Sequence, residues 1–450
     1  MPRSLPEFSK TVLLGSSVRA LAQSCRRLTS PTQPMFIWAL DQFADRDCVS
    51  AVDKVSQIEL SDVAFSLFGD VDSTGIEPRG RDTATNHSAS SEQLLFLPGG
   101  GTENYASLIH ELAANHHWCG ITGDSLLSLR DPQILFEIAR QSGLKAPLTY
   151  SHKTHPNRQS FARVVAEFDK NSVWLWKTAN KGGGLGVSKI QSESEFAYFF
   201  AENQTDFLQQ FIPGAPYGAT IIISANGHAE WVGACRLLPA SERLQHLDIQ
   251  IVSNHGSVER VVTSYEPRED FPFLFAGAVG PCRISTCIQE QLLRFAEACF
   301  RTFGIRGWFQ VDFIVDEAEQ SWVLEVNPRW SATMEIYERT YGMSLTAKHL
   351  EAWDICVAPT AVRQPEAGLV CWKDVIYADD DFLWTQTHLD RVDTLNTKYR
   401  AVYGWDLIAD IPNSQQSFAP GMPIFSVLAM GKTSRDLFAA RSDAQAVLRS

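Results

Sequence analysis

Long apolar runs are absent from this sequence of 450 residues. No run approaches the roughly 20 apolar residues that a membrane-spanning helix needs. Residues 1–6 also lack the apolar core of a signal peptide. We therefore expect a soluble protein without a membrane partner.

A disulfide framework is missing as well. The chain has 9 cysteines, an odd number, and no Cys-x-x-Cys motif. Its nearest pair, Cys282 and Cys287, does not have the spacing of a zinc knuckle. Thiols without a pairing pattern favour a reducing compartment, so we expect the protein to be cytoplasmic.

Basic runs are absent too, and the net charge is -13. This charge argues against a nucleic-acid partner, whereas a local basic cluster would still allow an anionic substrate. With 44% hydrophobic and 20% charged residues the composition is that of a globular protein. At this length we expect two to four subdomains.

The first ~100 residues predict a sheet of the Rossmann type. Residues 11–14 form an apolar run before Gly15, a helical pattern follows, and a second run at residues 35–40 ends on Asp41. This is the order strand, helix, strand. A lone Gly15 is not the dinucleotide fingerprint Gly-x-Gly-x-x-Gly, so NAD(P) or FAD is only weakly supported. The polar segment 71–91 predicts a surface loop.

A glycine-rich loop follows a predicted strand at residues 173–177. Because glycine lets backbone N–H groups wrap anionic oxygens and lysine supplies a point charge, the pattern favours a phosphate cradle. The alternative is a flexible turn or a tight hairpin. The residues of this loop are Lys177, Lys181, Gly182, Gly183, Gly184 and Gly186.

The most informative segment predicts an antiparallel hairpin over residues 307–316 and 322–327, joined by a polar turn. A symmetric register places residue 312 opposite residue 325. Asp312, Glu325 and Asn327 would then converge as oxygen ligands for Mg²⁺, which proteins hold with one or two carboxylates and substrate phosphates. Arg329 would fork onto a phosphate or carboxylate. The alternative is a polar face turned to solvent.

These features occur in an order that resembles the ATP-grasp superfamily. A lysine precedes a glycine-rich loop, Leu-Gln-Gln-Phe-Ile-Pro-Gly follows at residues 208–214, and Glu-Val-Asn-Pro-Arg ends at Arg329. Residues 100–104, 129–132 and 410–427 further resemble a branch of predicted carboligases related to biotin carboxylase. Some members of that branch are linked to tetrahydromethanopterin-dependent one-carbon metabolism.

The resemblance implies a fold that combines α/β and α+β parts. Residues 1–124 would form a Rossmann-like domain, and residues 125–355 a two-lobed ATP-grasp module with a lid lobe at about 145–212. Residues 356–450 would form a small β-rich lobe. Relatives are often dimers, so a homodimer is expected.

The resemblance also implies roles for individual residues. Lys177 would bind phosphate under the glycine loop, and Asp312, Glu325 and Asn327 would bind Mg²⁺, with Mn²⁺ as a substitute. Arg329 would steady an acyl phosphate. Many relatives have Glu where this chain has Gln210, and their upstream phosphate-binding lysine has Arg130 as its nearest counterpart. The hinge strand next to adenine would consist of Gln209, Gln210, Phe211 and Ile212.

We therefore expect an enzyme that uses ATP and Mg²⁺ to activate a carboxylate as an acyl phosphate, which an amine captures to give ADP and phosphate. Both substrates would be small molecules. A carboxylase acting through carboxyphosphate is one alternative, although no biotinyl-lysine motif occurs in the chain. A nucleotide-binding regulatory protein without turnover is the other.

Overall fold

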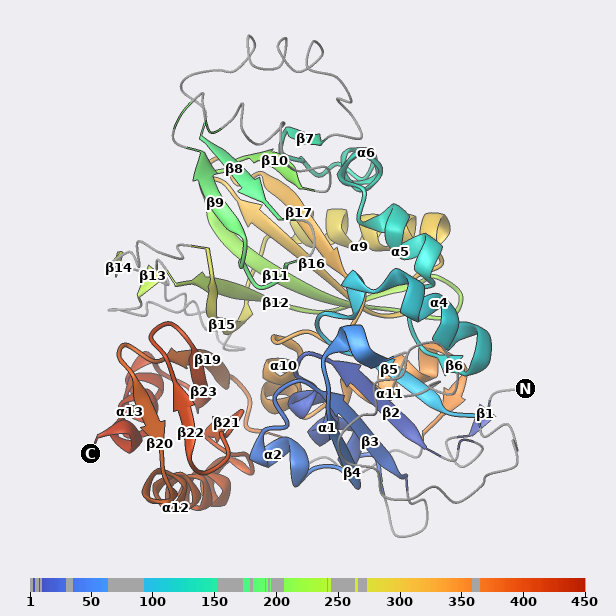
Figure 1. Ribbon diagram of the computed structural model, residues 1–450. Coiled ribbons are helices and arrows are strands. Elements are labelled where there is room, and N and C mark those ends of the chain that lie inside the picture. Colours follow the sequence, from blue (N-terminus) through green and yellow to red (C-terminus); the bar gives the residue numbers. More distant parts are fainter. Residues whose placement is uncertain are drawn as a thin grey trace.

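The computed structural model describes most of the chain and combines parallel and antiparallel sheets (Figure 1). The predicted loop at residues 71–91 lies outside the described residues. These are residues 3–4, 8, 10–29, 35–63, 93–151, 173–178, 181–190, 192, 195, 206–240, 242–243, 264–265, 273–357 and 365–449.

The N-terminal sheet is parallel and has the order β4-β3-β2-β5-β6. The predicted strand–helix–strand unit is confirmed, with helix α1 (Arg19–Arg26) between the central strand β2 and its neighbour β3. Each of the strands β2 and β5 is fully buried, because helices or other sheets cover both faces. The strands are β2 (Thr11–Gly15), β3 (Ile37–Asp41), β4 (Lys54–Gln57), β5 (Leu95–Pro98) and β6 (His117–Trp118).

A sheet of eight strands crosses the middle of the molecule, with the order β17-β16-β11-β12-β15-β19-β23-β21. Its pairs are antiparallel, and the turn at Asn226-Gly227 joins β11 to β12. Gly227 has φ +85°, which such a turn requires. Five of the strands are β11 (Ala215–Ile223), β12 (Ala229–Pro239), β15 (Phe275–Cys282), β16 (Gly307–Val315) and β17 (Ser321–Asn327).

A smaller antiparallel sheet of four strands lies beside β16 and β17 at the top of Figure 1. Its order is β7-β10-β8-β9, so the last of these strands in the sequence, β10, lies between β7 and β8. We call it the lid sheet. Its strands are β7 (Thr149–Ser151), β8 (Trp174–Lys177), β9 (Val187–Ile190) and β10 (Phe207–Gln210).

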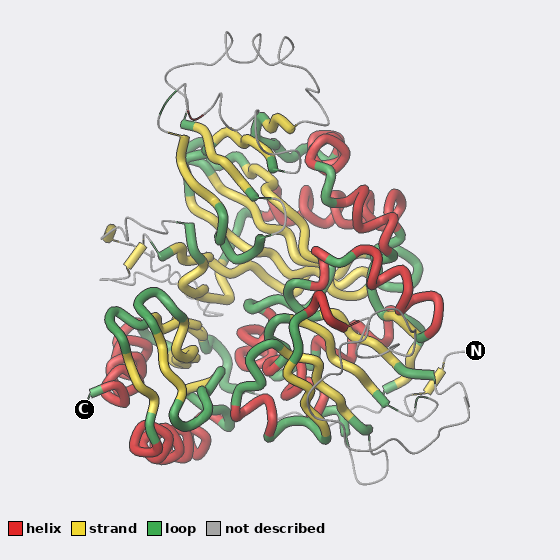
Figure 2. Tube along the Cα trace, viewed as in Figure 1, coloured by secondary structure: helices red, strands yellow, loops and turns green. Residues whose placement is uncertain are grey.

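Helices cover both faces of the eight-stranded sheet (Figure 2). On one face, Leu292 and Phe295 of α9 (Thr286–Phe303) share a core with Phe309 of β16. On the other face, Ile336 of α10 (Met334–Tyr341) shares a core with Trp308. Successive side chains of β16 thus point alternately into one core and into the other. The further helices are α2 (Arg46–Val49), α4 (Ala106–Asn115), α5 (Gly123–Leu129), α6 (Pro132–Gln141) and α11 (Leu345–Ala352).

The tail after residue 365 joins the central sheet through β19, β23 and β21, so its strands continue the sheet that contains β16. It also contains two helices, α12 (Gln386–Tyr403) and α13 (Ser434–Gln445), which the sequence analysis did not predict. The tail is therefore not mainly β. Its strands are β19 (Val370–Tyr377), β20 (Phe382–Trp384), β21 (Ile408–Ala409), β22 (Gln416–Phe418) and β23 (Pro423–Gly431).

Short elements complete the described part of the chain. No helix in that part is long and apolar enough to cross a membrane. The prediction of a mixed fold with a Rossmann-like beginning is confirmed. The short elements are β1 (Arg3–Ser4), β13 (Glu242–Arg243), β14 (Ser264–Tyr265) and β18 (Ile355–Cys356), with single helical turns at Leu60–Asp62, Thr102–Asn104 and Ala446–Leu448.

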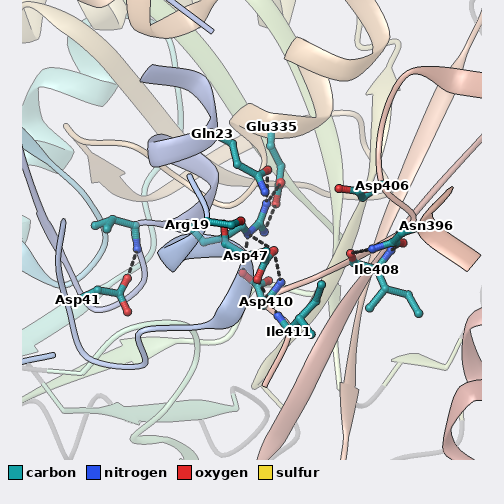
Figure 3. Close-up of polar contacts among 12 residues, drawn as sticks. Arg19, Gln23, Asp41, Asp47, Glu335, Asn396, Asp406, Ile408, Asp410 and Ile411 are labelled. Carbon is teal, nitrogen blue, oxygen red and sulfur yellow. Dashed lines mark hydrogen bonds and ion pairs between the residues drawn. The ribbon is translucent and has the colours of Figure 1, made fainter. Parts of the chain in front are cut away.

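Arg19, the first residue of α1, connects three parts of the fold (Figure 3). Its Nη1 donates to Oε2 of Glu335 at 2.6 Å, and its Nε donates to Oδ1 of Asp410 at 2.8 Å. Asp47 accepts the backbone N–H groups of Asp410 and Ile411 at 3.0 and 2.8 Å. The Arg19 and Glu335 side chains are only 1% and 6% exposed. A buried charge cluster thus joins the parallel sheet, α10 and the tail.

Candidate functional site

The hairpin of β16 and β17 has the predicted register. Asp312 pairs with Glu325, and Gln310 pairs with Asn327. Residues two apart on a strand share a face, so Gln310 and Asp312 point to the same side. Asp312 is half-buried and Glu325 is exposed. The structure therefore brings the predicted carboxylates together.

Hydrogen bonds hold the Asp312 carboxylate from two sides. Gln310 Nε2 donates to Oδ1 at 2.8 Å, and Asn327 Nδ2 donates to Oδ2 at 3.2 Å. The Oε1 atom of Gln310 in turn accepts from Ser331 Oγ and from Thr333 Oγ1. The sequence analysis missed Gln310, although its place two residues before Asp312 on the same strand face was a usable signal.

The electrostatics of this patch favour a cation. Burial and the neighbouring Glu325 carboxylate together raise the pKa of Asp312 to about 7, against a lowering by Gln310 and Arg329. Two carboxylates that repel each other in a half-buried place match a divalent metal. The described residues contain no metal-binding group of three or more His, Cys, Asp or Glu side chains. A metal bound here would thus need Asn327 and substrate oxygens besides the two carboxylates.

Lys177, at the end of β8 in the lid sheet, is electrostatically coupled to the same patch. Burial lowers the pKa of its ammonium group, whereas Glu325 and Asp312 raise it. The charge of Lys177 is thus close enough to the two carboxylates to interact with them, although these residues belong to different sheets. A lysine that interacts electrostatically with two acidic groups of another sheet suits an anion bound together with a metal.

The glycine-rich loop is the turn between β8 and β9, and it contacts the start of β15. The Phe275 N–H donates to the Gly183 carbonyl at 2.8 Å. Gly184 has φ +81°, and a Cβ atom added there would lie 1.8 Å from the Phe273 carbonyl oxygen. Gly182 and Gly183 have open space around them, and Lys181 is exposed. The loop is a hairpin turn, which is one of the alternatives stated for it, and there is open space beside Gly182 and Gly183.

The predicted hinge strand lies in the middle of the lid sheet. Gln209 is 1% exposed, and its Nε2 donates to Thr149 Oγ1 at 3.3 Å. The Oε1 atom of Gln210 accepts the Leu148 N–H at 3.4 Å. Both side-chain amides are thus bonded within the lid sheet. Ile212 is buried, and the Phe211 ring lies 6.3 Å from that of Phe273, next to the glycine-rich loop.

Arg329 forms an ion pair with Glu103, a residue of the segment 100–104 to which the sequence analysis gave no individual role. Its Nη2 donates to Glu103 Oε1 at 2.6 Å, and its Nε lies 3.2 Å from both carboxylate oxygens. Nη2 also donates to Asn327 Oδ1 at 3.0 Å. Burial raises the pKa of Glu103, but Arg329 and Arg130 lower it, with a net lowering. Arg130 thus interacts electrostatically with Glu103.

Comparisons with known proteins point to one domain family. Residues 138–333 match the family described as the ATP-grasp domain. A D-alanine–D-alanine ligase of Geotalea uraniireducens (strain Rf4) is 25% identical over 168 residues, which are 36% of this chain and 46% of that protein. The chain spans about half the length of the curated relatives it matches.

Solved structures resemble the fold over nearly the whole chain. Biotin carboxylase from Campylobacter jejuni has a TM-score of 0.62 and 12% identity, over 99% of this chain and 93% of that one. An L-amino acid ligase from Bacillus licheniformis has a TM-score of 0.58 and 11% identity, over 98% and 97%. The resemblance inferred from the sequence is confirmed at the level of the superfamily. The chain has the ATP-grasp fold, and residues 138–333 match the ATP-grasp domain family.

Proposed function

We propose that the protein is an ATP- and Mg²⁺-dependent ligase that joins a small-molecule carboxylate to an amine. The observation that carries this proposal is the hairpin of β16 and β17, which brings Asp312, Glu325 and Asn327 together. The electrostatic interaction of Lys177 with the two carboxylates supports it. The triphosphate would lie between these charges. We assign the metal to Asp312, Glu325 and Asn327, and there it would neutralise charge on the β- and γ-phosphate oxygens.

The residues of the chain would act mainly by position and charge. Lys177 would hold the γ-phosphate while the substrate carboxylate attacks it in line. The attack forms the acyl phosphate and breaks the bond to ADP. The amine then displaces phosphate from the acyl carbon. The open backbone at Gly182 and Gly183 would wrap the phosphates, and the contact of the loop with β15 would keep water away.

The names of similar proteins support this class of reaction. One relative is a D-alanine–D-alanine ligase, and one protein of similar fold is an L-amino acid ligase. We extend to this chain only the joining of a carboxylate to an amine. The same proposal includes several further assignments. They are membership of the carboligase branch, a homodimer, the substitution of Mn²⁺ for Mg²⁺, a cytoplasmic location, and the domain limits 1–124, 125–355 and 356–450.

The acceptor would enter at the carboxyl ends of β2 and β5. Strand order reverses between these two strands, because β3 and β4 lie on one side and β6 on the other. Ligands of open parallel sheets bind at such switch points. The end of β5 also contacts the site, since the Trp330 N–H donates to the Pro98 carbonyl at 3.0 Å. Both sides of the proposed reaction would thus meet near Arg329.

A coupled assay of ADP release, run over pairs of carboxylates and amines, tests the proposal. Release that needs both an acid and an amine, together with an amide product in the mass spectrum, is the expected result. Release that depends on bicarbonate would instead indicate a carboxylase acting through carboxyphosphate. Binding of Mg-ATP without turnover across a broad panel would indicate a regulatory nucleotide-binding protein. Either of these two results would overturn the ligase assignment.

A further inference from the structure

The pair of Glu103 and Arg329 joins two parts of the fold that are 226 residues apart in sequence. An arginine side chain has five N–H groups. Those of Arg329 donate to Glu103 from Nε and Nη2, to Asn327 from Nη2, and to the Trp330 carbonyl from Nη1. Among the described residues, only one N–H, on Nη1, is left without a protein acceptor. Arg329 is therefore largely committed to the protein itself.

The loop that carries Glu103 is fixed at several points. Gly101 has φ +89°, and a Cβ atom added there would lie 2.4 Å from Ser16 Oγ. Thr102 Oγ1 donates to the Gly99 carbonyl at 2.8 Å, and the Ser16 N–H donates to the Gly100 carbonyl at 2.7 Å. These bonds tie the loop to the carboxyl end of β2. Glu103 is thus presented to Arg329 from a rigid support.

The surroundings of the pair exclude a ligand on the side of Glu103. The Glu103 and Arg329 side chains are 11% and 17% exposed. The cavity beside them has a volume of about 10 Å³, and Ile109, Trp118 and Leu126 are among the residues that line it. A space of this size holds at most one water molecule. A substrate carboxylate therefore has no room beside Glu103, and we infer that the ion pair persists when substrates bind.

Arg329, held in place by Glu103, in turn orients one of the proposed metal ligands. Asn327 Oδ1 accepts from Arg329 Nη2, and Asn327 Nδ2 donates to Asp312 Oδ2. An amide oxygen has two lone pairs, so Asn327 Oδ1 can accept this bond and still bind a cation. The Arg329 bond also fixes which end of the amide faces Asp312. Groups that orient ligands in this way are a regular part of metal sites.

We propose that Glu103 is a positioning residue of the metal site, which acts through Arg329 on Asn327. This inference rests on the proposed function, because it takes Asp312, Glu325 and Asn327 as the ligands. It also changes the role of Arg329. With a single N–H left, Arg329 would donate one hydrogen bond to the reacting group and would not bind it in a bidentate manner.

The test measures Mn²⁺ binding to the full chain by electron paramagnetic resonance, with a non-hydrolysable ATP analogue present. Glu103→Gln should raise the Kd for Mn²⁺ by roughly 10-fold or more, as loss of an orienting partner usually does. Arg329→Gln should do the same, and the double variant should resemble Arg329→Gln alone. Asp374→Asn is the control. It removes a half-buried carboxylate whose Oδ2 lies 2.6 Å from Nε of Arg441 in the tail, and it should leave the Kd for Mn²⁺ unchanged.

The outcomes separate this inference from the proposed function. If the parent protein binds Mn²⁺ with the analogue and Glu103→Gln binds it within twofold of the parent, the positioning role is wrong and the ligase proposal stands. Additive losses in the double variant would also overturn the role, because Glu103 would then not act through Arg329. Absence of metal-nucleotide binding in the folded parent would overturn both. If Glu103→Gln does not fold, Glu103→Asp keeps the charge and retracts it by one methylene group. An unchanged Kd in that variant would count against the role.

Discussion

Glu335 accepts two hydrogen bonds from the Arg19 guanidinium, although 316 residues separate them in sequence. Lys373 also donates to Glu335, and Asp410 accepts from Arg19. Burial of so many charges gives little net stability, but the loss of one partner leaves the others without compensation. The cluster therefore makes the folding of three chain segments mutually dependent.

Arg19→Met should lower the free energy of unfolding by roughly 3–5 kcal/mol, since it leaves buried carboxylates without their partner. Arg46→Met is the matched control. Arg46 also connects the parallel sheet to the tail, through Asp393, but these side chains are 42% and 55% exposed. The control should cost about 1 kcal/mol or less. Urea unfolding of both variants checks this, and equal losses would show that burial of the cluster is unimportant.

Stability should fall in acid partly because of Glu335. Burial raises the pKa of this carboxyl, but the charges of Arg19 and Lys373 lower it more, to well below its usual range. A group with a lowered pKa in the folded state stabilises the protein above its unfolded pKa, which is about 4.3 for Glu. That stabilisation is lost as the pH falls below this value. Unfolding curves from pH 7 to pH 3 should thus depend less on pH in Glu335→Gln than in the parent. Parallel curves would contradict this.

The double variant Asp312→Asn with Glu325→Gln should lose the thermal stabilisation that Mg-ATP gives to the parent. Neutral amides bind Mg²⁺ much more weakly than carboxylates do. Differential scanning fluorimetry with and without Mg-ATP measures the effect. A double variant that gains as much stability from Mg-ATP as the parent would show that the metal lies elsewhere.

Lys177→Ala should weaken ATP binding by about 10-fold or more, the size expected for one charge-assisted hydrogen bond. Lys181→Ala is the control on the same loop. Lys181 is exposed, whereas Lys177 is half-buried and interacts with Asp312 and Glu325. Replacement of Lys181 should therefore cost less affinity for ATP than replacement of Lys177. Titration calorimetry of both variants decides the matter, and equal losses would mean that the cradle is wrongly assigned.

Gly184→Ala should prevent the glycine-rich loop from docking on β15, because a Cβ atom there meets the Phe273 carbonyl oxygen. A cost of roughly 1–2 kcal/mol in the docked state corresponds to about 5–30-fold faster release of a fluorescent ATP analogue. Gly182→Ala is the control, since nothing lies within 4 Å of a Cβ atom there. Stopped-flow release rates that match in the two variants would exclude a lid role for the docking contact.

Local pattern was sufficient to predict the hairpin of the site. The polar turn between β16 and β17 sets the register, and the register places Asp312 opposite Glu325. The strand ending on Lys177 and the turn at Asn226-Gly227 were predictable for the same reason. In each case the residues that determine the structure are neighbours in sequence.

Contacts between distant segments were not predictable in this way. Nothing near Glu103 in sequence indicates that its partner is Arg329, because the loop after β5 and the end of β17 meet only in the folded chain. The helix α12 was missed for another reason. Its buried positions include the polar residues His388 and Asn396, which weaken the apolar period of the helix.

The Arg19 cluster also limits how this protein can be divided. The segment that matches the ATP-grasp family ends at residue 333, two residues before Glu335. The partners of Glu335 lie on both sides of that segment, with Arg19 before it and Lys373 after it. A fragment restricted to residues 138–333 would also lack β19, which pairs with β15. We therefore expect this segment not to fold on its own, and deletions at either end of the chain to disturb the proposed nucleotide site.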